Sequence, residues 1–182
     1  MALSFRAVSS ETTTRTRNPS GIVTMAADEG SVVEPGQVLY ALDGTHAVVL
    51  LVGEVPAWRR LGPGAADGPD IAQLERNLEA LGFGFESVAT DDHWDDDTTE
   101  AVLALQAAVG TSEDGALDLG EVVYQPSAIR ITEVLGDLGS MVRQETPILA
   151  ATSTDREVAV ELEADRQSIV AIGAGVVVEL PD

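Results

Sequence analysis

Apolar residues follow two nearly identical patterns that start 109 residues apart, at Gly30 and Gly139. Residues 30–33 read Gly-Ser-Val-Val and residues 139–142 read Gly-Ser-Met-Val, and each is preceded by a strand-like run and followed by an apolar strand. A short β unit cannot bury its apolar face alone, so the two copies are expected to fold together as halves of one small β sandwich. The segment between them is then an inserted domain.

Turn residues predict a hairpin within the first copy. Pro35-Gly36 suits the centre of one turn, and Asp43-Gly44 suits a tight two-residue turn because both residues tolerate positive φ. Residues 37–42 and 46–52 are therefore expected to pair as antiparallel strands.

Between the copies the apolar spacing becomes three and four residues, which predicts two short helices. Asp70 with Gln73, and Asp97 with Glu100, are typical of capping boxes at the helix starts. Such short helices need packing partners. The residues expected to form that helical core are Ile71, Leu74, Leu78, Leu81, Phe83, Phe85, Trp94, Val102, Leu105, Val109 and Leu117.

These patterns predict an α+β multidomain chain that is mainly β. The expected segments are a strand or flexible stretch (1–20), a first β half (21–55), a linker (56–67), a helical insert (68–120), a second β half (121–153) and the first strands of a β-barrel domain (154–182). Trp58, inside the linker, is expected to pack at the junction between the units.

Charge and composition exclude several functions. The net charge is −21, and the ten basic residues are all arginine, so neither nucleic acid nor an anionic membrane surface is expected as a partner. Without lysine or cysteine the chain has no amine-linked cofactor, thiol nucleophile or thiolate metal site, and no cofactor is expected. The apolar runs are far shorter than the roughly 20 residues that cross a bilayer.

The acidic run at residues 91–97 allows two interpretations. Asp92, Asp95 and Asp97 carry the oxygen ligands that a hard cation prefers, although the spacing does not match an EF-hand loop. The alternative is a solvated loop that ends in a helix cap, where carboxylates favour the positive end of the helix dipole.

Candidate ligand-binding residues in the insert are Arg76, Trp94 and Gln106. For Gln106 the alternative is structural, since a helical Gln can bond the backbone of a neighbouring loop such as the Asp114-Gly115 turn. The two histidines have no serine or cysteine nucleophile motif beside them, and no carboxylate pair stands out among the 31 acidic residues. We therefore expect a protein that is not an enzyme.

Two resemblances to known families follow from these motifs. The peptidoglycan-binding domain 1 family is similar to this chain at residues 70–83, at the Thr-x-x-Ala-Val pattern within Thr98 to Gln106, and at the Asp114-Gly115 turn. The flanking β copies, above all residues 29–40, are similar to the split lipoyl-like (barrel-sandwich) domain of HlyD-type periplasmic adaptors, or membrane fusion proteins. Residues 156–182 are similar to the start of the adaptor β barrel.

The resemblances imply a non-catalytic, extracytoplasmic adaptor of a transport or efflux system, of actinobacterial type. Its implied partners are an ABC-type permease and ATPase, peptidoglycan and further copies of itself, with a membrane anchor outside this chain. Without lysine, the lipoyl-like unit is a scaffold rather than a swinging arm. Two alternatives remain at this point: the insert is a spacer without wall binding, or the chain is an accessory part of a cell-wall hydrolase.

Overall fold

The computed structural model describes residues 20–83, 90–144 and 146–154, and the backbone of strands at 5–8, 11–13 and 157–160. The chain divides into two compact units, one of residues 9–155 and one that joins residues 1–8 to 156–182. In the second unit, β1 (Phe5–Val8) pairs antiparallel with β11 (Glu157–Val160). The rest of the segment expected to begin a β-barrel domain, residues 161–182, lies outside the described residues.

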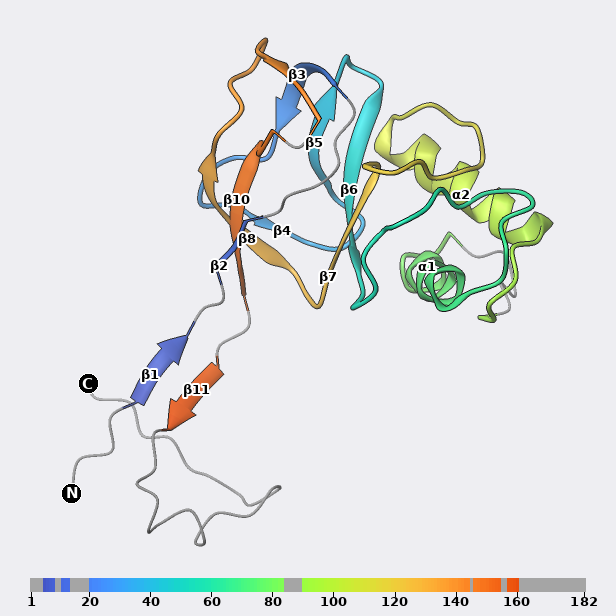
Figure 1. Ribbon diagram of the computed structural model, residues 1–182, viewed down its shortest axis with the longest axis horizontal. Helices are drawn as coiled ribbons and strands as arrows, with labels where there is room; N and C mark the ends of the chain where they lie inside the picture. The colour runs from blue at the N-terminus through green and yellow to red at the C-terminus, as the bar shows by residue number, and fades with distance from the viewer. Residues whose placement is uncertain are drawn as a thin grey trace, which may run out of the picture. The chain divides into compact units, whose positions relative to one another are not determined.

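The unit of residues 9–155 has a mixed α+β fold with two β-sheets and two helices (Figure 1). One sheet has the order β2-β10-β8-β4 and the other β7-β6-β5-β3-β9. Its strands are β2 (Glu11–Thr13), β3 (Gly21–Ala26), β4 (Val32–Val33), β5 (Val38–Leu42), β6 (His46–Val52), β7 (Val122–Gln125), β8 (Ile129–Val134), β9 (Met141–Val142) and β10 (Leu149–Ser153).

The two sequence copies pair with each other reciprocally. β4 of the first copy pairs with β8 of the second, and β9 of the second pairs with β3 of the first. The Gly30 amide donates to the Ile131 carbonyl, while the equivalent Gly139 amide donates to the Val23 carbonyl. Both glycines have positive φ, which a residue without Cβ adopts at little cost. Each copy therefore contributes a turn and a short strand to the other copy's sheet.

One apolar core lies between these strands, and both copies supply it. β3 and β8 have the same alternation of buried and exposed positions, as expected for strands with one face on a core. Equivalent residues such as Val33 and Val142, or Leu39 and Ile148, all belong to one cluster and are at most 3% exposed. Neither copy has this core alone.

β6 contributes side chains to two cores. Val48 and Leu50 belong to the core between the sheets, whereas Val49 and Leu51 belong to a second core shared with the helices. Because successive side chains of a strand point to opposite faces, a strand covered on both sides is an uninterrupted apolar run. The predicted hairpin is confirmed: β5 and β6 are antiparallel, and Asp43 and Gly44 both have positive φ.

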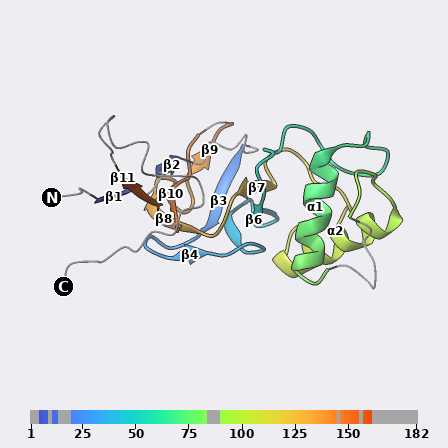
Figure 2. The same ribbon diagram turned by 90° about the horizontal axis from the view of Figure 1, so that it is seen from below.

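The insert begins and ends on neighbouring strands. β7 pairs in parallel with β6, and further along the two connecting segments meet in a bridge between Leu61 and Leu117. Figure 2 shows both helices on the β6–β7 side of the sheets. Because its ends are paired, the insert extends from the β unit without opening the sheet.

Both expected helices are present, as α1 (Pro69–Ala80) and α2 (Asp96–Val109). Their predicted caps are wrong. α1 begins after Gly68 with Pro69 in its first turn and no side-chain cap, because Asp70 is engaged elsewhere. α2 is capped by Asp95, whose carboxylate accepts the Thr98 amide at 2.8 Å. Within the described residues, no helix combines the length and apolarity needed to cross a membrane.

Candidate functional site

Two polar residues on one face of α1 bind the chain where it leaves β6. Asn77 accepts the Val52 amide and donates to the Val52 carbonyl, both at 2.7 Å. One turn earlier, Gln73 accepts the Glu54 and Val55 amides at 3.0 Å and donates to the Val55 carbonyl at 2.8 Å. The two side-chain amides thus satisfy backbone groups as a neighbouring strand would. They fix α1 against residues 52–55.

An ion pair anchors the first turn of the same helix. Arg59 binds Asp70 with two hydrogen bonds of 2.7 and 2.8 Å, a geometry that the planar guanidinium favours. The Arg59 guanidinium holds the pKa of Asp70 below its ordinary value, although burial opposes this. A Cβ at Gly68 would lie 2.6 Å from Asp70 Oδ1 and 2.9 Å from Arg59 Nη2, so this close pairing requires glycine there.

A groove of about 630 Å³ lies beside the contacts between α1 and residues 52–55. The turn between β4 and β5 approaches the end of α1 closely, since a Cβ at Gly36 would lie 2.7 Å from Leu81 Cδ2. The lining residues, mostly apolar at their exposed surface, are Pro35, Val52, Gly53, Glu54, Val55, Gln73, Arg76, Asn77, Ala80 and Leu81. The groove is therefore built jointly by the helical insert and the β unit.

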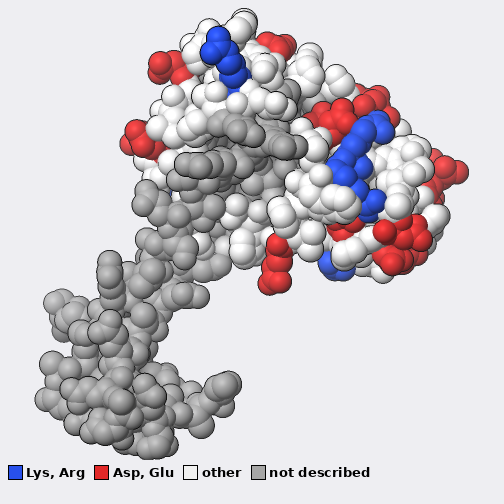
Figure 3. Space-filling view, viewed as in Figure 1, with Lys and Arg blue, Asp and Glu red and all other residues white. Residues whose placement is uncertain are grey.

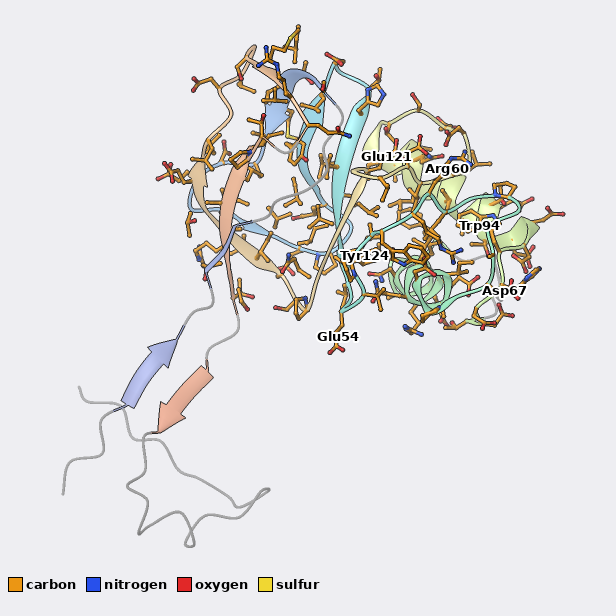
Figure 4. The ribbon with its side chains drawn as sticks, viewed as in Figure 1. Glu54, Arg60, Asp67, Trp94, Glu121 and Tyr124 are labelled. Carbon is orange, nitrogen blue, oxygen red and sulfur yellow. The ribbon has the colours of Figure 1, made fainter. Side chains whose placement is uncertain are left out.

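Charged side chains of both signs line this groove. Arg76 is exposed, and no ion pair joins it to another residue of the described chain. Glu54 is also exposed, and Figure 4 shows it beyond the end of β6, pointing away from the protein. In Figure 3 a band of basic residues crosses the helical part among acidic ones. The groove thus offers an apolar floor and a guanidinium, and the Glu54 carboxylate lies on its solvent side.

The structure places the three candidate ligand-binding residues in different surroundings. Arg76 lines the groove, whereas Trp94 and Gln106 are buried in the helical domain, at 5% and 1% exposure. The Trp94 indole donates to the Thr99 hydroxyl at 2.8 Å. The polar groups of Trp94 and Gln106 have partners inside the protein, so Arg76 alone of the three contributes to the groove.

Gln106 organises the loop that follows α2. Its amide nitrogen donates to Asp114 Oδ1 and the Ala116 carbonyl, and its oxygen accepts the amides of Asp114 and Gly115. These bonds from Gln106 hold the pKa of Asp114 below its ordinary value. The sequence allows a structural role for Gln106 as the alternative to ligand binding. The structure has that arrangement, with Gln106 bonded to the backbone of the loop.

Residues of the acidic run at 91–97 contact the segment before α1 and cap α2. The Asp92 carbonyl accepts the Gly68 amide, Asp95 caps the helix, and Asp97 is exposed in its first turn. His93 pairs with Asp67 at 2.9 Å, which raises the pKa of the imidazole. Within the described part of the chain, no group of three or more His, Asp or Glu side chains is arranged to hold a metal ion.

A second hollow, of about 460 Å³, lies where α2 leads back to β7, and three of the residues that line it are acidic. Asp114 binds Gln106, and Asp118 forms an ion pair with Arg60. Glu121 accepts the Asp118 amide, and burial raises its pKa. These carboxylates therefore fix the loop before β7.

The exposure of Trp58 differs from the prediction. Its place in the linker predicts packing at the junction between units, but the side chain is 62% exposed.

Three residues of α1 that hold the insert to the β unit and its linker are absent from the sequence-based prediction of the site. They are Asp70, Gln73 and Asn77. A signal for them is present in the sequence, because polar residues spaced by three and four on a short helix share one face and here flank the apolar stripe.

Comparison with known protein families identifies the helical insert. Residues 67–120 match the family model described as "Putative peptidoglycan binding domain". The insert is similar to this family. Searches of curated proteins and of solved structures gave no match. α1 and Arg76 lie within the matched residues, whereas Pro35 and residues 52–55 of the groove lie outside them.

A buried carboxylate connects the two helices of the insert. Glu75 is 1% exposed and contacts the Thr98 hydroxyl at 2.8 Å and the Asp91 amide at 2.9 Å. The Thr98 hydroxyl also lies 2.9 Å from Asp95 Oδ1, yet it has one proton to donate. Burial raises the pKa of Glu75, with Asp91 and Asp95 adding to the effect. A proton on Glu75 would satisfy both contacts of the Thr98 oxygen.

These pKa directions predict a stability maximum in weak acid. As pH falls from 7 to about 5, the free energy of unfolding should rise, because folded His93, Glu75 and Glu121 take up protons before the unfolded chain does. Below about pH 4 it should fall, because Asp70, Asp95 and Asp114 have lowered pKa values and the unfolded chain binds protons first.

Urea unfolding at several pH values measures this profile. The matched variant Glu75→Gln should reduce the rise between pH 7 and 5, leaving the part due to Glu121 and His93, and should keep the fall below about pH 4. A steady loss of stability from pH 7 to 5 in the unchanged chain would contradict the assignment of the raised pKa values.

Proposed function

We propose that the insert binds peptidoglycan through the groove beside α1. The observation that carries this proposal is the position of Arg76, which lies within the residues that match the peptidoglycan-binding family and lines a groove of about 630 Å³. Its guanidinium has no ion-pair partner among the described residues, so it is available to a ligand.

The groove suits a peptide stem of the wall polymer. Wall peptides carry carboxylates, which a guanidinium binds with two parallel hydrogen bonds. The apolar lining from Val52, Val55 and Leu81 suits small aliphatic side chains, and Glu54 suits an ammonium group on the same peptide. The net charge of the chain is −21, so an anionic ligand is repelled by the protein as a whole. An arginine inside the groove can still bind such a ligand locally.

Co-sedimentation with purified sacculi tests this function. Ala80 lines the groove and is exposed, so Ala80→Trp fills the groove without disturbing a core. Ala108→Trp, at an exposed position of α2, is the matched control. The unchanged chain and the control should pellet with sacculi, and Ala80→Trp should stay in the supernatant. Equal pelleting of both variants would reject the groove, and no pelleting of the unchanged chain would favour a spacer role for the insert.

The proposed role is binding without catalysis. Glu75, a buried carboxylate of the helical domain, contacts Thr98 and Asp91 rather than the groove. Asp70, Asp95 and Asp114 are each engaged by a neighbouring group that lowers their pKa. Clearing of a wall-polymer gel by the purified chain would contradict this role and favour the hydrolase alternative.

We further propose that the β unit is the barrel-sandwich scaffold of a HlyD-type adaptor in the cell envelope. The supporting observation is the reciprocal pairing of β4 with β8 and of β3 with β9 around one core, with the insert placed between the two halves. Cross-linking in intact cells, followed by identification of the captured proteins, tests this role. An ABC-type permease and ATPase are expected, and their absence from an otherwise efficient capture would count against the adaptor.

A further inference from the structure

An exposed indole stands on the linker that leads into the insert. Trp58 is 62% exposed, whereas Trp94, the other tryptophan, is 5% exposed. Trp58 lies outside residues 67–120, which match the family, and three positions after the groove residue Val55. An indole presents a large, rigid apolar face and a polar N–H edge, and tryptophan is enriched at binding interfaces for this reason.

Trp58 is supported from one side. The Arg59 guanidinium lies 4.9 Å from the centroid of its ring, within the range of a cation–π contact. Arg59 is in turn held by two hydrogen bonds to Asp70, whose side chain is 4% exposed. Because Arg59 covers one face of the indole, the exposed area belongs to the other face and the ring edges. The ring is held in place before any ligand arrives.

We propose that the free face of Trp58 stacks on a sugar ring of the glycan strand. This inference rests on the proposed wall-binding function and extends it from the peptide to the saccharide part of the polymer. An aromatic face is electron-rich, so it attracts the C–H groups on one side of a pyranose ring. This contact requires no charged group on either partner. An uncharged contact is favourable for a protein whose surface is strongly acidic.

In this proposal, the two ligand parts are divided between two residues. Arg76 serves a carboxylate in the groove, and Trp58, three positions after the groove residue Val55, serves a sugar. A ring that is already ordered loses little conformational freedom on binding, which favours affinity. The ion pair of Arg59 with Asp70 is then a positioning contact for the indole.

Fluorescence quenching tests the stacking. Acrylamide should quench mainly Trp58, because Trp94 is buried. A peptide-free oligosaccharide of four N-acetylglucosamine units should protect Trp58 from acrylamide and shift its emission. In the sacculus assay, Trp58→Ala should weaken binding by about tenfold, whereas Trp58→Phe, which keeps an aromatic face, should stay within about threefold of the unchanged chain.

Leu138→Ala is the control for loss of an exposed apolar side chain, because Leu138 is 70% exposed elsewhere in the β unit. It should bind sacculi as the unchanged chain does. Unaltered binding by Trp58→Ala, together with loss of binding by Ala80→Trp, would overturn the stacking and leave the groove intact. Failure of the unchanged chain to bind sacculi would overturn both.

Discussion

Gln106→Ala is expected to lower the free energy of unfolding by about 3 kcal/mol or more. Gln106 makes four hydrogen bonds to the loop at 114–116, and its side chain is 1% exposed. Alanine removes all four bonds and leaves the buried Gly115 amide and Ala116 carbonyl without these partners. Each such orphaned group costs about 1–3 kcal/mol, and the cavity adds to the loss.

Urea unfolding followed by tryptophan fluorescence measures this effect, because Trp94 lies in the same core as α2. Gln144→Ala is the matched control, since Gln144 is exposed, and it should change stability by less than about 0.5 kcal/mol. Equal unfolding midpoints for the two variants would show that Gln106 is not the organising residue of this loop.

Arg76→Glu is expected to weaken binding to sacculi by about 10- to 100-fold. The change removes the proposed partner of a ligand carboxylate and puts a like charge in its place, so attraction becomes repulsion. Arg76 is on the exposed side of α1 and pairs with no described residue, so the fold should keep its stability.

Arg143→Glu is the control for charge, because it changes the net charge equally at an exposed position of the β unit. Binding isotherms with sacculi at fixed ionic strength compare the two variants. If both variants lose affinity to the same extent, the effect is general repulsion between acidic surfaces and Arg76 has no specific role. If only Arg76→Glu is impaired, the groove contact is supported.

Local patterns along the sequence predict much of the fold. The repeat at 30–33 and 139–142 indicates two related β segments, and the structure places them in reciprocal strand pairs around one core. The helices are evident from apolar spacing. Their caps are not, because Asp70 is engaged by Arg59, a residue 11 positions away whose contact no local pattern reveals.

The candidate site is harder to predict because it depends on tertiary contacts. Arg76 stands out in the sequence, but the groove also needs Pro35 and residues 52–55, which come close only after the insert docks on the β unit. Gln73 and Asn77 hold the insert to the β unit by hydrogen bonds to backbone groups of residues 52–55. Any residue type provides these backbone groups, so the sequence of that segment does not reveal the contact. The exposure of the Trp58 side chain could not be predicted either, because it depends on the path of the linker in the folded protein.

The most direct test of the shared groove is an NMR titration of the isotope-labelled chain with a soluble disaccharide–peptide fragment of peptidoglycan. We expect the largest shifts in backbone amides at residues 52–55 and 76–81, from both the β unit and α1, and their loss in Arg76→Glu. Shifts confined to α2, or no shifts at a fragment concentration that saturates sacculus competition, would contradict a binding site built by the two parts together.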